Sequence, residues 1–292
     1  MASLARRYAD NAPGDFYVDS TCIDCDACRR IAPSVFAEAS DHSFVRDQPA
    51  TPSDARRALM ALVACPTGSI GTASRRDVRP ALDAFPEPLA EADGVSFCGF
   101  TSPNSFGAWS WLVERPGGNV LVDSPKALPR LLDALAHRGG VATMFLTHKD
   151  DVADHAAFRK RFGCERVLHE ADRTASTREI ERPLSGREPV ALAPDLLAIP
   201  TPGHTRGHSV LLYRKEFLFT GDHLAWSRRR NALVAFRDAC WYSWTEQIRS
   251  MESLLDIPFE WVLPGHGATR HFDSRAQARR ALEACVAWMK RE

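Results

Sequence analysis

The chain has 292 residues, 45% of them hydrophobic and 25% charged, a composition typical of a globular protein with one large and one small domain. Its 37 Lys and Arg balance 37 Asp and Glu, so no net charge attracts it to nucleic acid or an anionic membrane. No stretch approaches the roughly 20 apolar residues of a membrane span, and the N-terminal region lacks the apolar run of a signal peptide. We therefore expect a cytoplasmic protein whose eight cysteines are metal ligands or buried thiols rather than disulfides.

The elements are predicted from hydrophobic periodicity and from turn residues. In the first unit, residues 8–75, a helix is expected over 52–64, with Ser53 as its cap and Pro66 as its stop. The proline-containing stretch 76–90 is expected to be a stiff linker to a second domain, 91–292. In the second domain the expected strands are 95–100, 109–113, 120–123, 141–147, 196–200, 209–213, 217–220 and 261–263. The expected helices are 127–137, 153–162, 243–255 and 274–291. Many strands with interspersed helices predict an α/β (α+β) fold with two sheets covered by helices.

The first unit carries four cysteines with the spacing of a metal cluster. Cys22, Cys25 and Cys28 occupy every third position, and Cys65 follows much later, directly before Pro66. A loop can aim all three early sulfurs inward, and the late cysteine then closes the site, which is a ligand pattern of iron–sulfur clusters. Zinc is the competing metal, but zinc sites more often contain two separated pairs of cysteines.

The segments CIDCDACRRIAPSVF and ACPTGSI resemble the two halves of a bacterial-type ferredoxin with a single cluster. A second cluster would need another cysteine just after the triplet, where the chain has Ala32 and Pro33. The resemblance implies one [4Fe-4S] cluster bound by Cys22, Cys25, Cys28 and Cys65. A cluster that only staples the small unit is the alternative, because units of this size often need such a staple.

A second group of metal-binding residue types follows the predicted strands of the second domain. The loop after the strand 141–147 holds His148, Asp150, Asp151, Asp154 and His155. Three glycine-flanked turns, TPGHTRGH, LFTGDH and LPGHG, supply His204, Asp222 and His266. Glycine lets the backbone turn sharply beside an ion, so these turns predict a second metal site.

The order of these pieces over about residues 94–270 resembles the metallo-β-lactamase superfamily, and most closely its glyoxalase II-like branch. The resemblance implies a four-layer αββα sandwich with metals at one edge of its sheets. It assigns His148 as the first ligand, Asp154 and His155 as the end of the same motif, and His204 as the next. Asp222 would bridge two metals and His266 would complete the second. Asp154 and Asp222 would also be the catalytic carboxylates.

The loop after His148 departs from the superfamily motif. Five residues rather than three separate His148 from Asp154, and Asp150 stands where a second histidine is usual. Asp150 or Asp151 would then replace a nitrogen ligand with oxygen, which shifts metal preference from zinc towards iron or manganese. The alternative is a mononuclear site. The sequence thus predicts one or two divalent ions, either zinc or iron, with manganese as a further candidate.

Three functions fit these signatures. The first is a metallohydrolase that acts on a small-molecule ester, thioester or lactone, with the cluster serving electron transfer or redox control. The second is an iron oxidoreductase on the same fold, supplied with electrons by the ferredoxin unit or a redox partner protein. The third is a non-enzymatic redox-sensing module. Because 25 residues follow LPGHG, too few for the further helical domain of glyoxalase II, lactoylglutathione is not the expected substrate.

Three aromatic residues and two histidines near these turns are also assigned from the sequence. Trp241, Tyr242 and Trp244 are expected in the core or in a pocket wall, with a substrate-facing surface as the alternative. His208 and His223 are expected to fix the tautomer of a metal ligand.

Overall fold

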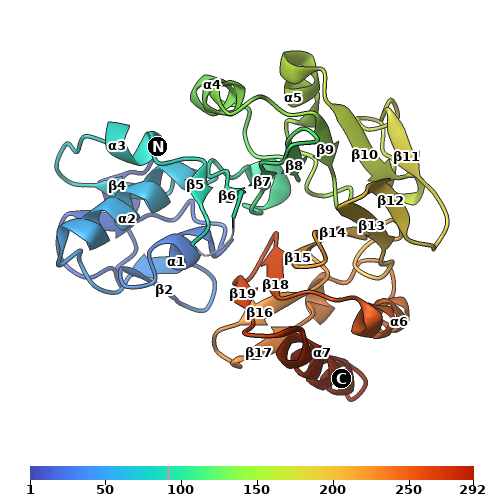
Figure 1. Ribbon diagram of the computed structural model, residues 1–292. Helices are drawn as coiled ribbons and strands as arrows, with labels where there is room; N and C mark the ends of the chain where they lie inside the picture. The colour runs from blue at the N-terminus through green and yellow to red at the C-terminus, as the bar shows by residue number, and fades with distance from the viewer. Residues whose placement is uncertain (91–92) are drawn as a thin grey trace. The chain divides into compact units, whose positions relative to one another are not determined.

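The computed structural model describes residues 1–90 and 93–292, which form two compact units. Unit 1 contains Met1–Val141 and Ala153–Phe162, and unit 2 contains Ala142–Val152 and Gly163–Glu292 (Figure 1). These units follow packing and do not coincide with the expected domains 8–75 and 91–292, whose bounds stay a prediction. The expected start at residue 91 lies outside the described residues.

Unit 1 joins the cysteine-bearing segment to the first strands of the longer region. Its strands are β1 (Phe16–Val18), β2 (Phe36–Glu38), β3 (Ser43–Val45), β4 (Ile70–Thr72), β5 (Glu87–Pro88), β6 (Val95–Phe97), β7 (Trp111–Val113) and β8 (Val120–Val122). Its helices are α1 (Ala27–Ile31), α2 (Pro52–Ala64), α3 (Arg79–Leu82), α4 (Pro129–His137) and α5 (His155–Phe162). The strands form the pairs β1–β4 and β2–β3 and the antiparallel series β5-β6-β7-β8.

The pairing of β1 with β4 brings the four cysteines together. The two strands are antiparallel, with Phe16 opposite Thr72 and Val18 opposite Ile70. The loop that leaves β1, with the early cysteines, therefore lies at the same end of the pair as the loop that enters β4, with Cys65. Helix α2 packs against α1 and β4 and buries Ala58, Met60, Ala61 and Ala64.

The predicted helix over 52–64 is confirmed, but its predicted cap is wrong. Thr51 accepts the backbone N–H of Asp54, and the Asp54 carboxylate accepts the backbone N–H of Thr51 in return. Because Pro52 occupies the first helical position, where its missing N–H is not needed, the cap falls one residue before it rather than on Ser53.

The stretch expected as a linker contains regular structure. Helix α3 and strand β5 lie within 76–90, and β5 pairs with β6 through Glu87 opposite Phe97. Phe85, only 3% exposed, contacts the rings of Phe97 and Phe100. The stretch 76–90 therefore packs against the sheet and does not form an isolated spacer, although it contains prolines.

Unit 2 holds most of the predicted second metal site. Its strands are β9 (Thr143–Phe145), β10 (Glu165–His169), β11 (Arg182–Leu184), β12 (Val190–Ala193), β13 (Leu196–Pro200), β14 (Ser209–Tyr213), β15 (Phe217–Gly221), β16 (Ala225–Ser227), β17 (Ala232–Val234), β18 (Trp261–Pro264) and β19 (Arg270–His271). Its helices are α6 (Trp244–Ser253) and α7 (Arg275–Met289). One sheet has the order β12-β13-β14-β15-β18-β19, β16 pairs with β17, and β9, β10 and β11 run parallel.

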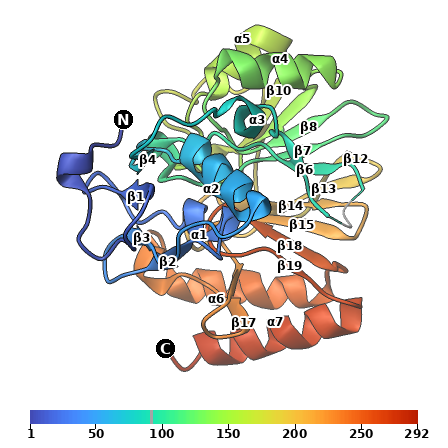
Figure 2. The ribbon, with the colours of Figure 1, turned by 90° about the vertical axis from the view of Figure 1, so that its left-hand side faces the viewer.

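The core of unit 2 lies between the six-stranded sheet and its two helices. Helices α6 and α7 lie side by side (Figure 2), and Trp244 of α6 donates its indole N–H to the Met289 carbonyl of α7. Met251 and Leu282 pack with Leu218 of β15 in one buried apolar cluster. Burial of these apolar side chains stabilises the sheet whose strand ends are followed by the predicted ligands.

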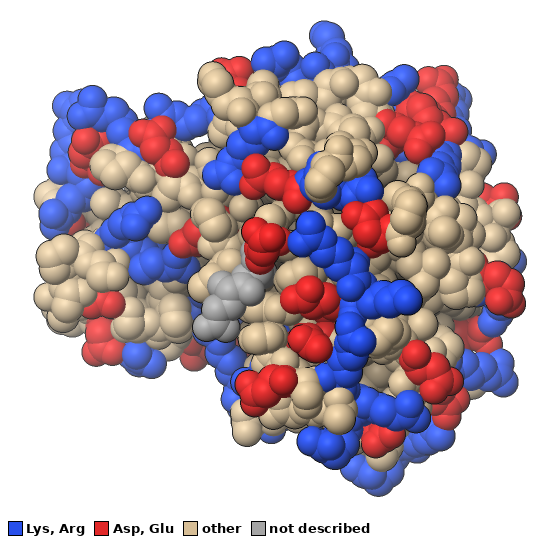
Figure 3. All heavy atoms as spheres, in the orientation of Figure 1, with Lys and Arg blue, Asp and Glu red and all other residues tan. Residues whose placement is uncertain are grey.

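The surface carries mixed charge, as the composition predicted. Lys and Arg side chains lie beside Asp and Glu on the face drawn in Figure 3. None of the helices in 1–90 and 93–292 has the length and apolar character needed to span a bilayer.

Candidate metal centres

Three of the four ligand-bearing turns of unit 2 leave the same edge of one sheet. Strands β13 and β15 both pair antiparallel with β14, and β15 pairs parallel with β18, so β13, β15 and β18 all point the same way. Their carboxyl ends, followed by His204, Asp222 and His266, therefore lie at one edge. The predicted convergence of these turns is thus a consequence of sheet topology.

The fourth turn joins this edge through the backbone. His148 follows β9, and the carbonyl of Thr147 accepts the N–H of Ser209 at the start of β14. Glycine is needed at two places for this close approach. A Cβ on Gly221, which has a φ of +47°, would lie 2.4 Å from Thr147 Oγ1. A Cβ on Gly265 would lie 2.9 Å from Asp222 Oδ1 and 3.0 Å from Asp151 Oδ2.

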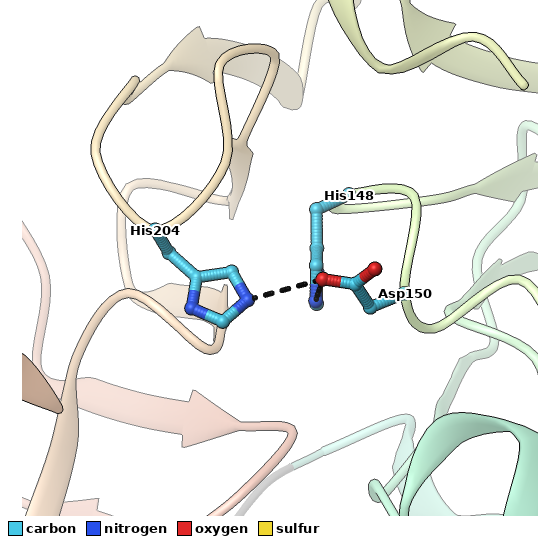
Figure 4. A group of neighbouring side chains, drawn as sticks. All are labelled: His148, Asp150 and His204. Carbon is cyan, nitrogen blue, oxygen red and sulfur yellow. Dashed lines mark ion pairs between the residues drawn. The ribbon is translucent and has the colours of Figure 1, made fainter. Parts of the chain in front are cut away.

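The centre of the site contains His148, Asp150 and His204, which point towards one another in Figure 4. Asp150 Oδ2 lies 3.9 Å from His148 Nε2 and 3.5 Å from His204 Nε2. Asp222 Oδ2 lies 3.7 Å and 3.9 Å from the same two nitrogens. Four ligands at about 2.1 Å from a tetrahedral ion would be about 3.4 Å apart, so these four N···O distances are close to those between ligands of one metal ion.

The two imidazoles are prepared for metal binding. The Nε2 atoms of His148 and His204 are buried and make no hydrogen bond within the described part of the chain. Thr147 Oγ1 lies 2.9 Å from His148 Nδ1, which orients the ring and leaves Nε2 for a ligand. Burial lowers the pKa of His148 to about 4, so the ring is neutral at pH 7. A buried nitrogen lone pair without a proton is the form that binds a divalent cation.

Asp222 uses its two oxygens for different neighbours. While Oδ2 faces His148 and His204, Oδ1 lies 2.7 Å from His266 Nδ1. Burial alone would raise the pKa of Asp222, but the nearby His266 and His148 rings outweigh burial and hold that pKa well below its usual range. The carboxylate is therefore charged at neutral pH, with Oδ2 facing His148 and His204 and Oδ1 facing His266.

Asp151 belongs to a second group of ligand atoms. A carboxylate oxygen of Asp151, a ring nitrogen of His148 and a carboxylate oxygen of Asp222 form a set whose members are all within 4.8 Å of one another. Asp151 is 1% exposed, whereas Asp150 is exposed. The facing His204 ring and the nearby His148 ring lower the pKa of Asp150. Both aspartates thus place a carboxylate oxygen close to a ring nitrogen of His148.

Asp154 and His155 are placed differently from the rest of the predicted ligands. Both belong to unit 1, where Asp154 Oδ2 accepts the backbone N–H of Ala127 at 2.9 Å and His155 is buried at the start of α5. Neither is a member of the two ligand groups in the described residues. Their assignment as ligands, and that of Asp154 as a catalytic group, stays a prediction.

Asp172 is a site residue that the sequence reasoning missed. Its buried carboxylate accepts the N–H of Lys149 at 3.1 Å, the N–H of Gly207 at 2.6 Å and the hydroxyl of Thr205 at 2.5 Å. It therefore ties the loop after His148 to the turn that carries His204. Asp172 has no motif around it, so only the fold reveals this role.

Other histidines and aromatic residues of the turns lie around the candidate ligands His148 and His204. The His208 ring lies 5.2 Å from the rings of both His148 and His223, and the role of His208 and His223 in fixing the tautomer of a ligand stays a prediction. Trp241 is 65% exposed and Tyr242 is 45% exposed, and both donate their backbone N–H to the His204 carbonyl. The expected place for these two in the core is therefore wrong.

In unit 1, the four cysteines line one pocket together with Ile23 and Pro66. Backbone N–H groups of Asp24 and Ser43 approach Cys22 Sγ at 3.5 Å, and that of Ser69 approaches Cys65 Sγ at 3.3 Å. Burial raises the pKa of Cys28 to about 12, so a thiolate there needs a bound cation or cluster. This donor set fits an iron–sulfur cluster.

The chain has a pocket lined by cysteines and a separate group of histidines and carboxylates at the carboxyl ends of strands. These two sites are typical of a metalloprotein with two centres. Its residues 104–266, more than half of the chain, match the family model of the metallo-beta-lactamase superfamily, and the chain belongs to that superfamily. Residues 18–72 match the model of the 4Fe-4S single cluster domain of Ferredoxin I. The predicted fusion of these two domains and the predicted fold class are confirmed.

Individual relatives agree with this assignment. A hydroxyacylglutathione hydrolase of Acidiphilium cryptum (strain JF-5) is 28% identical over 202 residues, which are 65% of this chain and 82% of that protein. A hydroxyacylglutathione hydrolase of Rhizobium etli is 29% identical over 120 residues, or 39% of this chain and 46% of that protein. The solved structure of TMB-1 is 17% identical, with a TM-score of 0.50 over 66% of this chain and 94% of that chain, a likeness of fold alone.

Proposed function

We propose that the protein is a metal-dependent hydrolase of esters, thioesters or lactones that carries a [4Fe-4S] unit for electron transfer or redox control. The observation that supports this most is the divided Asp222 carboxylate, with Oδ2 near His148 and His204 and Oδ1 on His266. A carboxylate shared between two ligand sets is suited to two ions about 3.5–4 Å apart. The named activity of the two relatives supports hydrolysis.

The ligands are assigned from the geometry of unit 2. His148, Asp150, His204 and one oxygen of Asp222 would hold the first ion, and Asp151, His266 and the other oxygen of Asp222 would hold the second. Asp151 thereby takes the place that the superfamily resemblance gives to Asp154. A bound divalent ion lowers the pKa of a coordinated water from 15.7 towards about 7 and polarises a substrate carbonyl. Two carboxylates among the first four ligands favour iron or manganese over zinc.

Side chains of the site would position the attacking water and the substrate. Asp222 is held charged by its imidazole neighbours, so it can keep the attacking water at a fixed place between the ligand sets. Asp150 is the exposed member of the group, so the substrate would approach the ions from its side. Cys22, Cys25, Cys28 and Cys65 would hold the cluster, and cytoplasm is the compartment that suits eight free thiols.

The substrate is proposed to carry an apolar acyl group. Trp241 and Tyr242 are exposed although they are large and apolar, and Trp241 lies edge-on to the His204 ring at 6.3 Å. Exposed aromatic side chains beside a metal site provide area for an apolar group at little conformational cost.

The test uses anaerobically purified, metal-analysed protein and a panel of ester, thioester and lactone substrates with short and long acyl chains. We expect turnover of at least one class, lost on removal of the divalent ions by a chelator that leaves the cluster absorbance intact. Absence of turnover in all three classes by protein loaded with zinc, iron or manganese would contradict the proposal.

An iron oxidoreductase is the second candidate, favoured by one observation. His148, His204 and Asp150 form a set of two histidines and one carboxylate, the ligand type of non-haem iron oxygenases. The ferredoxin-type domain would then supply single electrons. About five or six irons per chain, with EPR signals from both centres that respond to reductant, would favour this candidate. Four irons together with zinc would exclude it.

A further inference from the structure

The cysteine pocket has a wall that lies outside the ferredoxin-type sequence. The ligands and the N–H groups that approach their sulfurs all belong to residues 18–72, the range of the ferredoxin family match. A separate segment of unit 1, residues 101–109, packs on the Cys25 side of this pocket. Residues 104–109 of it already belong to the range of the metallo-beta-lactamase match.

Gly107 makes the closest approach between the segment 101–109 and the pocket. Its φ is +83°, and a Cβ built on it would lie 2.7 Å from both Cβ and Sγ of Cys25 and 3.2 Å from Cγ of Pro66. No side chain fits at such distances, so the backbone of Gly107 itself covers the Cys25 sulfur. The Gly107 N–H is bonded to the Ser102 carbonyl at 2.8 Å, which fixes the backbone in this place.

Further contacts hold the segment 101–109 and its neighbour Lys126 against the residues beside the cysteines. The buried Thr101 hydroxyl donates to the carbonyl of Ala64, one residue before Cys65, at 2.7 Å. Lys126 Nζ donates to the carbonyl of Pro66, one residue after Cys65, at 2.7 Å. These bonds hold the backbone on both sides of Cys65.

Aromatic packing completes the wall. The guanidinium of Arg30, two residues after Cys28, lies 3.8 Å from the Trp109 ring centre, and both side chains are buried. Trp109 stacks on Phe97 of β6 at 3.7 Å. The cysteine loops are therefore packed against the β5–β8 sheet of unit 1 as well as against each other.

We propose that the segment 101–109 is part of the cluster site and that Gly107 is its positioning residue, setting the distance at which protein backbone covers the Cys25 sulfur. This inference rests on the cluster assignment proposed above. Solvent exposure and packing around the sulfurs set the stability and reduction potential of such clusters. The cluster is then an integral part of the longer chain, and the Gly107 backbone limits the access of oxygen and chelators on its Cys25 side.

The test compares full-length Gly107→Ala with Gly139→Ala, both purified and reconstituted anaerobically. Gly139 is a matched control because its φ is +94° but an added Cβ would meet only Asn119 Nδ2 at 3.7 Å. In Gly107→Ala we expect cluster absorbance to be lost to air or chelator several-fold faster than in wild type, with a shifted midpoint potential and altered EPR. Gly139→Ala should keep the wild-type values.

Wild-type rates, potential and EPR in folded Gly107→Ala would overturn the inference. If circular dichroism shows that Gly107→Ala is unfolded, the same measurements are made on Thr101→Val and Lys126→Met. Each of these variants removes one hydrogen bond of the segment or of its neighbour Lys126 without adding bulk. Faster cluster loss in both supports the inference, and wild-type behaviour in both overturns it. A wild-type protein without a four-iron cluster would instead refute the cluster assignment itself, so the two failures are distinguishable.

Discussion

At the scale of single residues, Asp172 determines how the two ligand loops meet. It touches neither proposed ion, yet it accepts hydrogen bonds from Lys149, Thr205 and Gly207. We predict that Asp172→Ala lowers divalent-metal affinity by roughly 10–100-fold, as is typical when a residue that orients ligands is removed. Competition with a metal-binding dye measures this affinity. Asp256→Asn, at an exposed carboxylate, is the control, and equal affinities in the two variants would refute the role of Asp172.

Trp241 tests the proposed substrate class. Its ring is exposed beside His204, so Trp241→Ala removes contact area without opening the core. We predict a several-fold higher KM for substrates with long apolar acyl chains and a nearly unchanged kcat, the pattern of a residue that binds ground state and transition state equally. Short-chain substrates serve as the internal control. An equal change for both chain lengths would argue against an apolar acyl site.

At the scale of elements, the cap of α2 gives a clean stability comparison. Thr51 accepts a hydrogen bond from Asp54 N–H at 3.1 Å and forms a capping box, whereas Ser53 has no such role. We predict that Thr51→Ala lowers the free energy of unfolding by about 1 kcal/mol. Ser53→Ala should change the free energy of unfolding by only a few tenths of the Thr51→Ala effect. Urea denaturation followed by circular dichroism measures both, and a larger effect at Ser53 would refute the observed cap.

A salt link at the start of β10 makes the stability of unit 2 depend on pH. Arg166 donates to both oxygens of Glu181 at 2.8–3.0 Å, and these bonds lower the pKa of Glu181 to about 2. Because the folded-state pKa is below the unfolded value of 4.5, the link stabilises the fold above pH 4.5 and is lost as pH falls towards 2.

Glu181→Gln tests this sign. We predict that the variant is less stable than wild type by about 1–2 kcal/mol at pH 7, as for other hydrogen bonds to charged groups. The difference should shrink below pH 4.5. Thermal melts of both proteins from pH 7 to pH 3.5 measure it, and a difference that grows on acidification would contradict the assignment.

Elements with strong periodicity could be predicted, and those defined by their partners could not. The strands at 196–200 and 209–213 and the helix over 52–64 match the structure in both bounds, because apolar runs and an N-terminal proline mark them. Strands β5, β16, β17 and β19 have two or three residues each, so only pairing defines them. The cap at Thr51 was missed because Ser53 offers the same hydroxyl.

At the scale of the whole molecule, the sequence carried the residue types of both centres but not all of their geometry. The cysteine spacing was sufficient to indicate the pocket, and the glycine-flanked turns were sufficient to indicate His204, Asp222 and His266, which the sheet topology brings to one edge. Which aspartates of the loop 150–154 face His148 depends on its path, which local sequence does not determine. The cover over Cys25 also depends on a contact between residues 82 positions apart, Cys25 and Gly107.

Asp222 provides the most direct test of the account, since it is the one residue that both proposed ions share. The measurement is metal content and hydrolytic turnover of anaerobically purified wild type and Asp222→Asn, with folding checked by circular dichroism. We predict about four cluster irons and two further divalent ions in wild type. The variant should be folded, with its cluster intact, fewer divalent ions and turnover lowered more than about 100-fold, because loss of a ligand exceeds loss of its supporting residue. A folded variant with wild-type turnover, or an unfolded one without its cluster, would contradict the assignment of Asp222 to a hydrolytic metal centre.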